Sequence, residues 1–162
     1  MDTTQISCSL RKVKSFLGVF PSDLLPRSVP QSCTVIINAD PHTEKGSHWL
    51  AIHFRPKSSS SYYFDSYGTV PLVPDIQAFI RRNCTVADYN KRQLQGLTSN
   101  VCGKYCCLFA HYMDLGYTPQ QFVGLYDARD ADAQTERLFE SELGPLPPPM
   151  LRGRGQCSSS FL

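Results

Sequence analysis

A polar, turn-rich segment runs directly into a long apolar one at residues 95–116, QGLTSNVCGKYCCLFAHYMDLG. The apolar part predicts a helix over 102–115 that stops at Gly116. Because this helix is apolar on nearly every side, we expect it in the core. Cys102 stands at its first position, where free N–H groups and the helix dipole favour a thiolate. The alternative for Cys102 is a small, buried residue without chemistry.

The composition fits one folded domain rather than a disordered or membrane chain. The 162 residues are 41% hydrophobic and 19% charged, and we predict a single domain over 1–145 with a flexible, Pro-rich and basic tail over 146–162. The net charge of +2 is too small to argue for a nucleic-acid partner. No apolar run could span a membrane and no secretory signal begins the chain, so we expect no membrane partner.

The seven cysteines bear on the cellular setting. They are too few for a disulfide scaffold and odd in number, so we expect an intracellular, reducing environment with mostly free thiols. Cys106 and Cys107 follow Cys102 along the apolar helix, where core packing is favoured. A metal site is the third option for these cysteines, but no second Cys-x-x-Cys pair exists, and we predict no metal.

Hydrophobic periodicity predicts an α+β domain. We expect a small mixed or antiparallel sheet packed against helices, with the nucleophile at the N-terminus of a buried central helix. The strands are predicted at 33–38, 48–55, 62–65 and 91–95. The helices other than 102–115 are predicted at 3–17, from 75 to 82, at 118–126 and at 130–143.

A thiolate nucleophile needs a base, and the base needs an acceptor that orients it. If 48–55 and 62–65 form a hairpin, His48 at the start of one strand meets Asp65 at the end of the next. The alternative for Asp65 is a turn-capping aspartate. The other histidines fit less well: one lies in an exposed loop, one inside a strand and one too far along the helix (His42, His53 and His111).

Four motif positions in a fixed order carry a resemblance to a known family. They are Gly46-Ser47-His48-Trp49, Asp65 seventeen positions after the histidine, Gln95, and Cys102 seven positions after the glutamine. This pattern resembles the adenovirus-type (adenain-like) cysteine proteases, which are related to the SUMO- and ubiquitin-like-protein proteases. We estimate that the resemblance covers about residues 10–125.

The resemblance implies a role for each matching residue. His48 is the general base, Asp65 the third member of the triad and Cys102 the nucleophile. The Gln95 side chain and the Cys102 backbone N–H form the oxyanion hole. The implied activity is that of a cysteine endopeptidase that cleaves next to glycine or small residues and matures proteins of a virus or virus-like mobile element. A nuclear or virion location is implied in the same way.

Two further positions have open interpretations. Trp49 either lines the substrate cleft or is a plain core aromatic residue. Cys84 lies eleven positions before Gln95, and the resemblance implies a cysteine that accepts an activating peptide by disulfide; the alternative is a half-buried thiol at a helix end. Family members are also helped by DNA, but the basic residues of this chain fit ordinary solvated charge as well (Arg11, Lys12, Lys14, Arg81, Arg82, Arg152 and Arg154).

Two alternative functions remain at this point, and in each case we expect a monomer. The Asp65 context, Tyr-Phe-Asp-Ser-Tyr-Gly, is more similar to the SUMO-protease side, which favours a protease that removes ubiquitin-like modifiers. The spacing from Gln95 to Cys102 favours the adenoviral side. A non-catalytic, capsid-associated binding module on the same fold is the second alternative.

Overall fold

One mixed sheet organises the protein. The computed structural model describes residues 1–29, 32–55, 57, 59–127 and 129–149. Its strands follow chain order across the sheet: β1 (Phe16–Pro21), β2 (Cys33–Asn38), β3 (Trp49–Arg55), β4 (Ser60–Phe64) and β5 (Val86–Tyr89). The central pairs β2–β3 and β3–β4 are antiparallel, whereas β1–β2 and β4–β5 are parallel. The predicted α+β class is confirmed.

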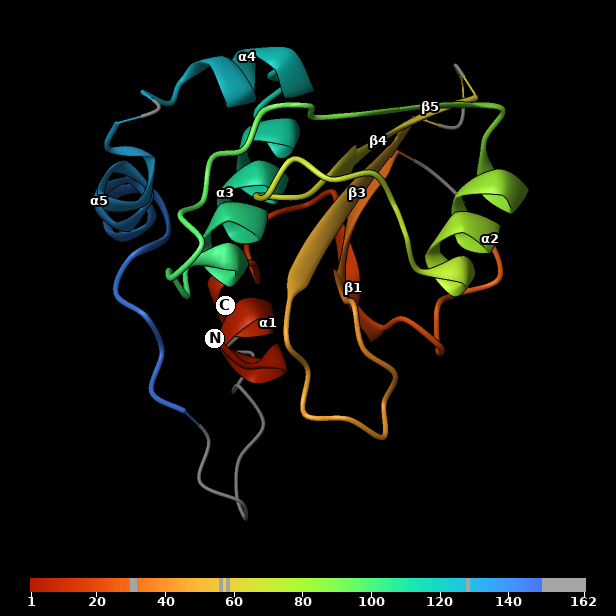
Figure 1. Cartoon of the computed structure of the whole chain (residues 1–162), viewed down its shortest axis with the longest axis horizontal. Coiled ribbons are helices and arrows are strands. Elements are labelled where there is room, and N and C mark those ends of the chain that lie inside the picture. Colours follow the sequence, from red (N-terminus) through yellow and green to blue (C-terminus); the bar gives the residue numbers. More distant parts are fainter. Residues whose placement is uncertain (30–31, 56, 58, 128, 150–162) are drawn as a thin grey trace, which may run out of the picture.

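Helices cover both faces of the sheet (Figure 1). The helices are α1 (Thr3–Ser9), α2 (Pro74–Asn83), α3 (Cys102–Asp114), α4 (Pro119–Gly124) and α5 (Ala131–Leu143). α2 packs on one face through Ile76, Phe79 and Ile80, and α3 packs on the other against β3 and β2. α5 lies outside α3 and separates it from solvent on that side. None of the described helices has the length and hydropathy that crossing a membrane requires.

The alternation of side chains along β3 divides the core in two. Leu50, Ile52 and Phe54 face α2, whereas Trp49 and Ala51 face α3. On the α3 side, an aromatic cluster joins helix to sheet: Phe109 stacks on Phe64 with ring centroids 4.8 Å apart and meets Phe122 edge-on at 5.5 Å. The buried helix predicted from Cys102 is therefore the element on which one half of the core is built.

The predicted helix over 3–17 is wrong beyond its first turns. α1 ends at Ser9, and residues 16–21 form the edge strand β1. The helix begins at an Asp2 cap, whose carboxylate accepts from the Gln5 N–H at 2.8 Å. A distant group then fixes the bend, because the Asp114 carboxylate accepts from the Ser15 N–H at 2.7 Å.

The predicted strand over 91–95 is also wrong. The strand in this region is β5, at residues 86–89, and it pairs in parallel with β4. Residues 90–95 instead run as an irregular segment along the end of β4, where the N–H groups of Leu94 and Gln95 donate to the Ser66 carbonyl at 2.9 and 3.0 Å. This displacement matters for function because the segment carries Gln95.

The predicted C-terminal tail is described only in part. After α5, the chain runs without helix or strand to residue 149. It contacts α1 where the Pro147 carbonyl accepts from Gln5 Nε2 at 2.7 Å. Residues 150–162 lie outside the described residues, so the boundary of the predicted tail stays a prediction.

Candidate active site

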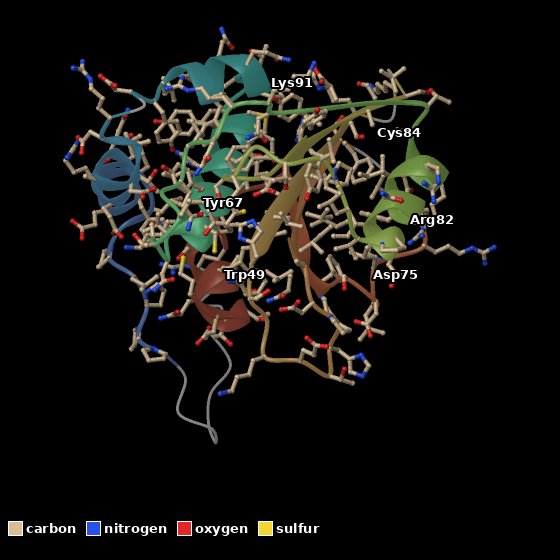
Figure 2. All side chains as sticks on the ribbon, in the orientation of Figure 1. Trp49, Tyr67, Asp75, Arg82, Cys84 and Lys91 are labelled. Carbon is tan, nitrogen blue, oxygen red and sulfur yellow. The ribbon has the colours of Figure 1, made fainter. Side chains whose placement is uncertain are left out.

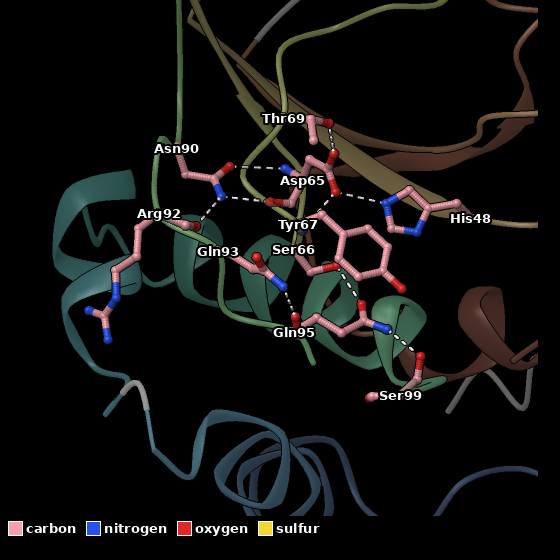
Figure 3. Close-up of polar contacts among 10 residues, drawn as sticks. All are labelled: His48, Asp65, Ser66, Tyr67, Thr69, Asn90, Arg92, Gln93, Gln95 and Ser99. Atoms are coloured by element: carbon pink, nitrogen blue, oxygen red, sulfur yellow. Dashed lines mark hydrogen bonds and ion pairs between the residues drawn. The ribbon is translucent and has the colours of Figure 1, made fainter. Parts of the chain in front are cut away.

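The ends of two neighbouring strands bring His48 and Asp65 together. Ala51 on β3 pairs with Phe64 on β4, so the residue before β3 lies beside the residues after β4. The His48 Nε2 atom lies 2.7 Å from Asp65 Oδ1 (Figure 3). The hairpin geometry expected from the sequence is therefore present in the structure. Because Nε2 contacts Asp65, Nδ1 is the His48 ring nitrogen that does not contact this carboxylate.

The Asp65 carboxylate is buried and fully engaged. It is 2% exposed, and besides His48 it accepts from the Tyr67 N–H at 2.9 Å and from the Thr69 hydroxyl. Burial by itself raises the pKa of this carboxyl, but hydrogen bonds from His48, Thr69 and Tyr67 outweigh it and lower the pKa below its ordinary value. Asp65 is thus an anion held in one orientation.

The His48 imidazole is held between a carboxylate and an aromatic ring. The Tyr67 ring stacks on it, with centroids 4.9 Å apart and planes 29° from parallel. Burial lowers the pKa of His48, but hydrogen bonding to Asp65 and to Cys102, together with their charges, outweighs burial and raises the pKa to about 9. These surroundings favour the imidazolium at neutral pH.

Cys102 lies at the start of α3, with its thiol against His48. Burial raises its pKa, yet hydrogen bonding to the His48 side chain and to the backbone of Trp49 and Gly103 lowers it below the ordinary value. At the buried cysteines Cys33 and Cys106, burial is the largest effect and the pKa of each thiol is raised. The Cys102 sulfur therefore differs from these thiols in favouring the anion.

Gln95 lies beside Cys102 in an ordered loop. The glutamine is 1% exposed, and its Nε2 donates to the Ser99 carbonyl at 2.7 Å. On the outer side of the loop, the Asp132 carboxylate at the start of α5 accepts from the Gly96 N–H at 3.0 Å and from the Tyr105 hydroxyl at 3.0 Å. The loop is thus tied to both α3 and α5.

Trp49 is packed in the core and also faces the space beside Cys102. It is 8% exposed and belongs to the core cluster around α3, yet it also lines the cavity at Cys102. Its indole N–H donates to the Met1 carbonyl at 3.0 Å. A Cβ atom at Gly103 would lie 3.1 Å from Met1 Cβ and 3.3 Å from Trp49 Cδ1, so a side chain at this position would require both neighbours to move by a few tenths of an ångström.

These residues surround a cavity of about 360 Å³. Its lining includes His48, Trp49, Gln95 and Cys102, which come from the start of β3, the irregular segment and the start of α3. A second cavity of about 330 Å³ shares Met1, Gly46 and Trp49 with the first. The two cavities therefore lie next to each other on either side of these residues.

The remaining candidates lie away from this cavity. Cys84 and Arg82 lie at the α2 side of the sheet, apart from Trp49 and Tyr67 (Figure 2). The half-buried Cys84 thiol donates to Ser61 Oγ at 3.0 Å. The Arg82 guanidinium donates to the carbonyls of Pro26 and Arg27 at 2.9 and 3.1 Å. Arg82 therefore bonds the backbone of residues 26 and 27, a contact that the sequence did not indicate.

The other histidines are engaged elsewhere, and no metal centre stands out. His42 pairs with Asp23, and His111 Nε2 lies 3.5 Å from Glu142 Oε2. The buried His53 lies 2.9 Å from the Thr34 hydroxyl through its Nδ1. Within the described residues, no three His, Cys, Asp or Glu side chains are grouped as metal ligands.

Sequence reasoning missed several residues of the site. Ser66 and Tyr67 belong to the Asp-Ser-Tyr-Gly turn that the sequence singled out only as a context for Asp65, and Thr69 follows this turn. Asn90 was not singled out at all, although it is buried and bonds both backbone groups of Asp65. The signal available in the sequence was the run of hydrogen-bonding residues directly after the candidate carboxylate.

Comparison with known proteins supports the resemblance. No protein-family model matches the chain. The protease of Porcine adenovirus A serotype 3 is 28% identical over 151 residues, which covers 81% of this chain and 72% of the relative. The protease of Human adenovirus A serotype 12 is 32% identical over 112 residues, which covers 60% of this chain and 51% of the relative. The chain thus spans about half the length of the human virus protease it matches.

A solved structure agrees at the level of the fold. The crystal structure of an ASFV protease superimposes with a TM-score of 0.51 and 21% identity, over 71% of this chain and 46% of that one. Similarity in sequence and similarity in fold point in the same direction. The chain is therefore related in sequence to the adenovirus-type, adenain-like cysteine proteases, as its motifs predict, and the predicted enzyme class, a cysteine-type protease, is confirmed.

Proposed function

We propose that the protein is an endopeptidase in which Cys102, His48 and Asp65 form the catalytic triad. The observation that carries this proposal is the series of contacts from the Asp65 carboxylate, 2.7 Å from His48 Nε2, through the imidazole to a Cys102 thiol at a helix start. The raised pKa of His48 and the lowered pKa of Cys102 favour a thiolate–imidazolium pair.

The geometry supports the following steps. The Cys102 thiolate attacks the scissile carbonyl carbon and forms a C–S bond. The Cys102 backbone N–H and the Gln95 side-chain Nε2–H that is not bonded to Ser99 stabilise the negative oxygen. The His48 imidazolium gives its proton to the leaving amine as the C–N bond breaks. Water, deprotonated by His48, then attacks the thioester, and the thiolate leaves. Asp65 holds the imidazole in the required tautomer throughout.

The proposed substrates are viral or virus-like proteins, cut next to glycine or another small residue. Support for a viral substrate comes from the kinship with adenovirus proteases. Support for small residues comes from the cavity, because the rings of Trp49 and Tyr67 both line the space around Cys102. Support for a peptide substrate comes from the neighbouring cavity, which shares Met1, Gly46 and Trp49 with the first and offers space for residues on one side of the scissile bond.

A substrate panel tests this proposal. Fluorogenic peptides that differ only in having glycine, alanine or leucine beside the scissile bond are compared with ubiquitin- and SUMO-type fluorophore conjugates. We expect turnover of the glycine peptide, less of the alanine peptide and almost none of the leucine peptide. Cleavage of the modifier conjugates alone would make the protein a deconjugating protease, and no turnover of any substrate would favour a binding module.

The pH dependence of turnover follows from the ion pair. Below the lowered pKa of Cys102 the thiolate is protonated and activity falls. Above about pH 9, the pKa of His48, the imidazolium is lost and activity falls again. In Asp65→Asn the acceptor oxygen stays but the charge is removed, so the pKa of His48 decreases and the alkaline limb moves to lower pH. An alkaline limb at the same pH in this variant would contradict the role of Asp65.

An activating peptide bound through Cys84, and activation by DNA, are separate proposals. Cys84 is a free, half-buried thiol with a hydrogen bond to Ser61, so a disulfide there would replace an existing contact. Incubation of the protein with cysteine-containing peptides, with the modified residue mapped by mass spectrometry, tests the first. Turnover with and without duplex DNA at two salt concentrations tests the second, because phosphate contacts weaken as salt rises.

A further inference from the structure

The residue after Asp65 contacts the other half of the catalytic machinery. Ser66 is fully buried, with 0% exposure, and its hydroxyl donates to Gln95 Oε1 at 2.6 Å. Consecutive residues at the end of β4 point in different directions, so Asp65 reaches His48 while Ser66 reaches Gln95 (Figure 3). The proposed reaction steps do not involve this serine directly.

The Gln95 carboxamide is held at both of its ends. A carbonyl oxygen can only accept, so the Ser99 carbonyl requires Nε2 to face it, and the two atoms are 2.7 Å apart. The hydroxyl of Ser66 satisfies Oε1 from the opposite side. With one Nε2–H bonded to Ser99, the second Nε2–H remains for the cavity that Gln95 lines with Cys102. A rotated carboxamide would present oxygen there and repel an oxyanion.

The backbone around Ser66 is braced as well. The Asp65 N–H donates to Asn90 Oδ1 at 2.9 Å, and Asn90 Nδ2 donates to the Asp65 carbonyl at 2.6 Å. The Ser66 carbonyl accepts from the N–H groups of Leu94 and Gln95. Because this backbone is held in place, the Ser66 hydroxyl is a hydrogen-bond donor in a fixed position for the Gln95 side chain.

We propose that Ser66 is a positioning residue that fixes the Gln95 carboxamide with an N–H directed at the oxyanion. This inference rests on the proposed function, because the oxyanion arises only in acyl transfer. A donor that acts on the oxyanion stabilises the transition state and not the bound substrate. Loss of its orientation therefore reduces kcat and leaves KM nearly unchanged.

Ser66→Ala tests the proposal with Ser61→Ala as the matched control. Ser61 is also a buried serine, it lies on β4, and its hydroxyl bonds Cys84 instead of the site. We expect kcat on the glycine peptide to fall about tenfold in Ser66→Ala, since one hydrogen bond of typical strength is lost, and to be unchanged in Ser61→Ala. In a Gln95→Ala background, Ser66→Ala should have no further effect. An equal loss in that background, or an unchanged kcat in the single variant, would overturn the proposal.

A spectroscopic measurement separates this inference from the proposed function. The Nε2–H₂ signals of Gln95 in a ¹⁵N–¹H spectrum are assigned by their loss in Gln95→Ala. In the unsubstituted protein we expect both signals to lie away from the shifts of an exposed glutamine and to show the ¹⁵N relaxation of a rigid group; in Ser66→Ala the shifts should move toward those of an exposed glutamine and the relaxation should become that of a mobile side chain. Mobile-type relaxation in the unsubstituted protein would refute a fixed carboxamide without any variant. If the protein cleaves no peptide but the signals behave as expected, the proposed function fails, and what stands is that Ser66 fixes the Gln95 carboxamide.

Discussion

Replacement of Cys102 by alanine is expected to abolish turnover and to leave the fold intact. In the proposed mechanism the sulfur bonds the substrate carbonyl carbon, and loss of the nucleophile in a triad costs a factor on the order of 10⁶ in kcat. Cys102 is only partly buried and occupies the first position of α3, so the substitution opens little space in the core. The measurements are kcat on the glycine peptide, the circular dichroism spectrum and the thermal midpoint.

Cys84→Ala is the matched control for this experiment. Cys84 is likewise free and half-buried but lies at the end of α2, away from the cavity, and its variant should keep full activity in the absence of an activating peptide. In the unsubstituted protein at neutral pH, iodoacetamide should modify Cys102 faster than Cys84. Equal rates would contradict an activated thiolate, and loss of the folded spectrum in Cys102→Ala would show that this cysteine is structural.

Gln95→Ala is expected to reduce kcat by about 100- to 1,000-fold, with a small effect on KM. This is the usual consequence of removing one side-chain donor from an oxyanion hole. The Gln95 amide is buried and held by Ser66 and Ser99, so its donor is already oriented before substrate binds. The measurement is a full kinetic curve on the glycine peptide, analysed separately for kcat and KM.

Gln77→Ala supplies the comparison. Gln77 also donates through its Nε2 to a carbonyl, that of Pro71 at 2.8 Å, but on α2 and outside the catalytic cavity. Its variant should retain the original kcat. A fall in kcat of less than about threefold in Gln95→Ala would mean that the amide holds the loop and does not stabilise the oxyanion.

The parts of the fold that the sequence predicts are those with strong local patterns. The helix from Cys102 is continuously apolar, and the strands at 33–38 and 49–55 have the β-branched or alternating residues typical of a sheet. Because these elements flank the motifs, the approach of His48 to Asp65 could be expected from hairpin geometry alone. The contact between His48 and Asp65 could thus be predicted from the sequence.

The elements that failed depend on distant contacts. β1 was predicted as helix because Val13 and Leu17 continue an apolar face, whereas its strand form depends on pairing with β2 and on the bonds from Ser15 to Asp114. β5 is mostly exposed and has no hydrophobic alternation to reveal it. Likewise, no local pattern links Ser66 to Gln95 or Asn90 to Asp65, since each pair is separated by at least 25 residues and meets only after folding.

The order of the proposed triad residues along the chain determines when a newly synthesised molecule can first hold all three of them in contact. His48 and Asp65 leave the ribosome well before Cys102, and the thiol reaches the imidazole only when α3 packs on β3. An incomplete nascent chain therefore carries a base without a nucleophile. The proposed triad is therefore complete only after residues up to 114 have been made and α3 has packed on the sheet.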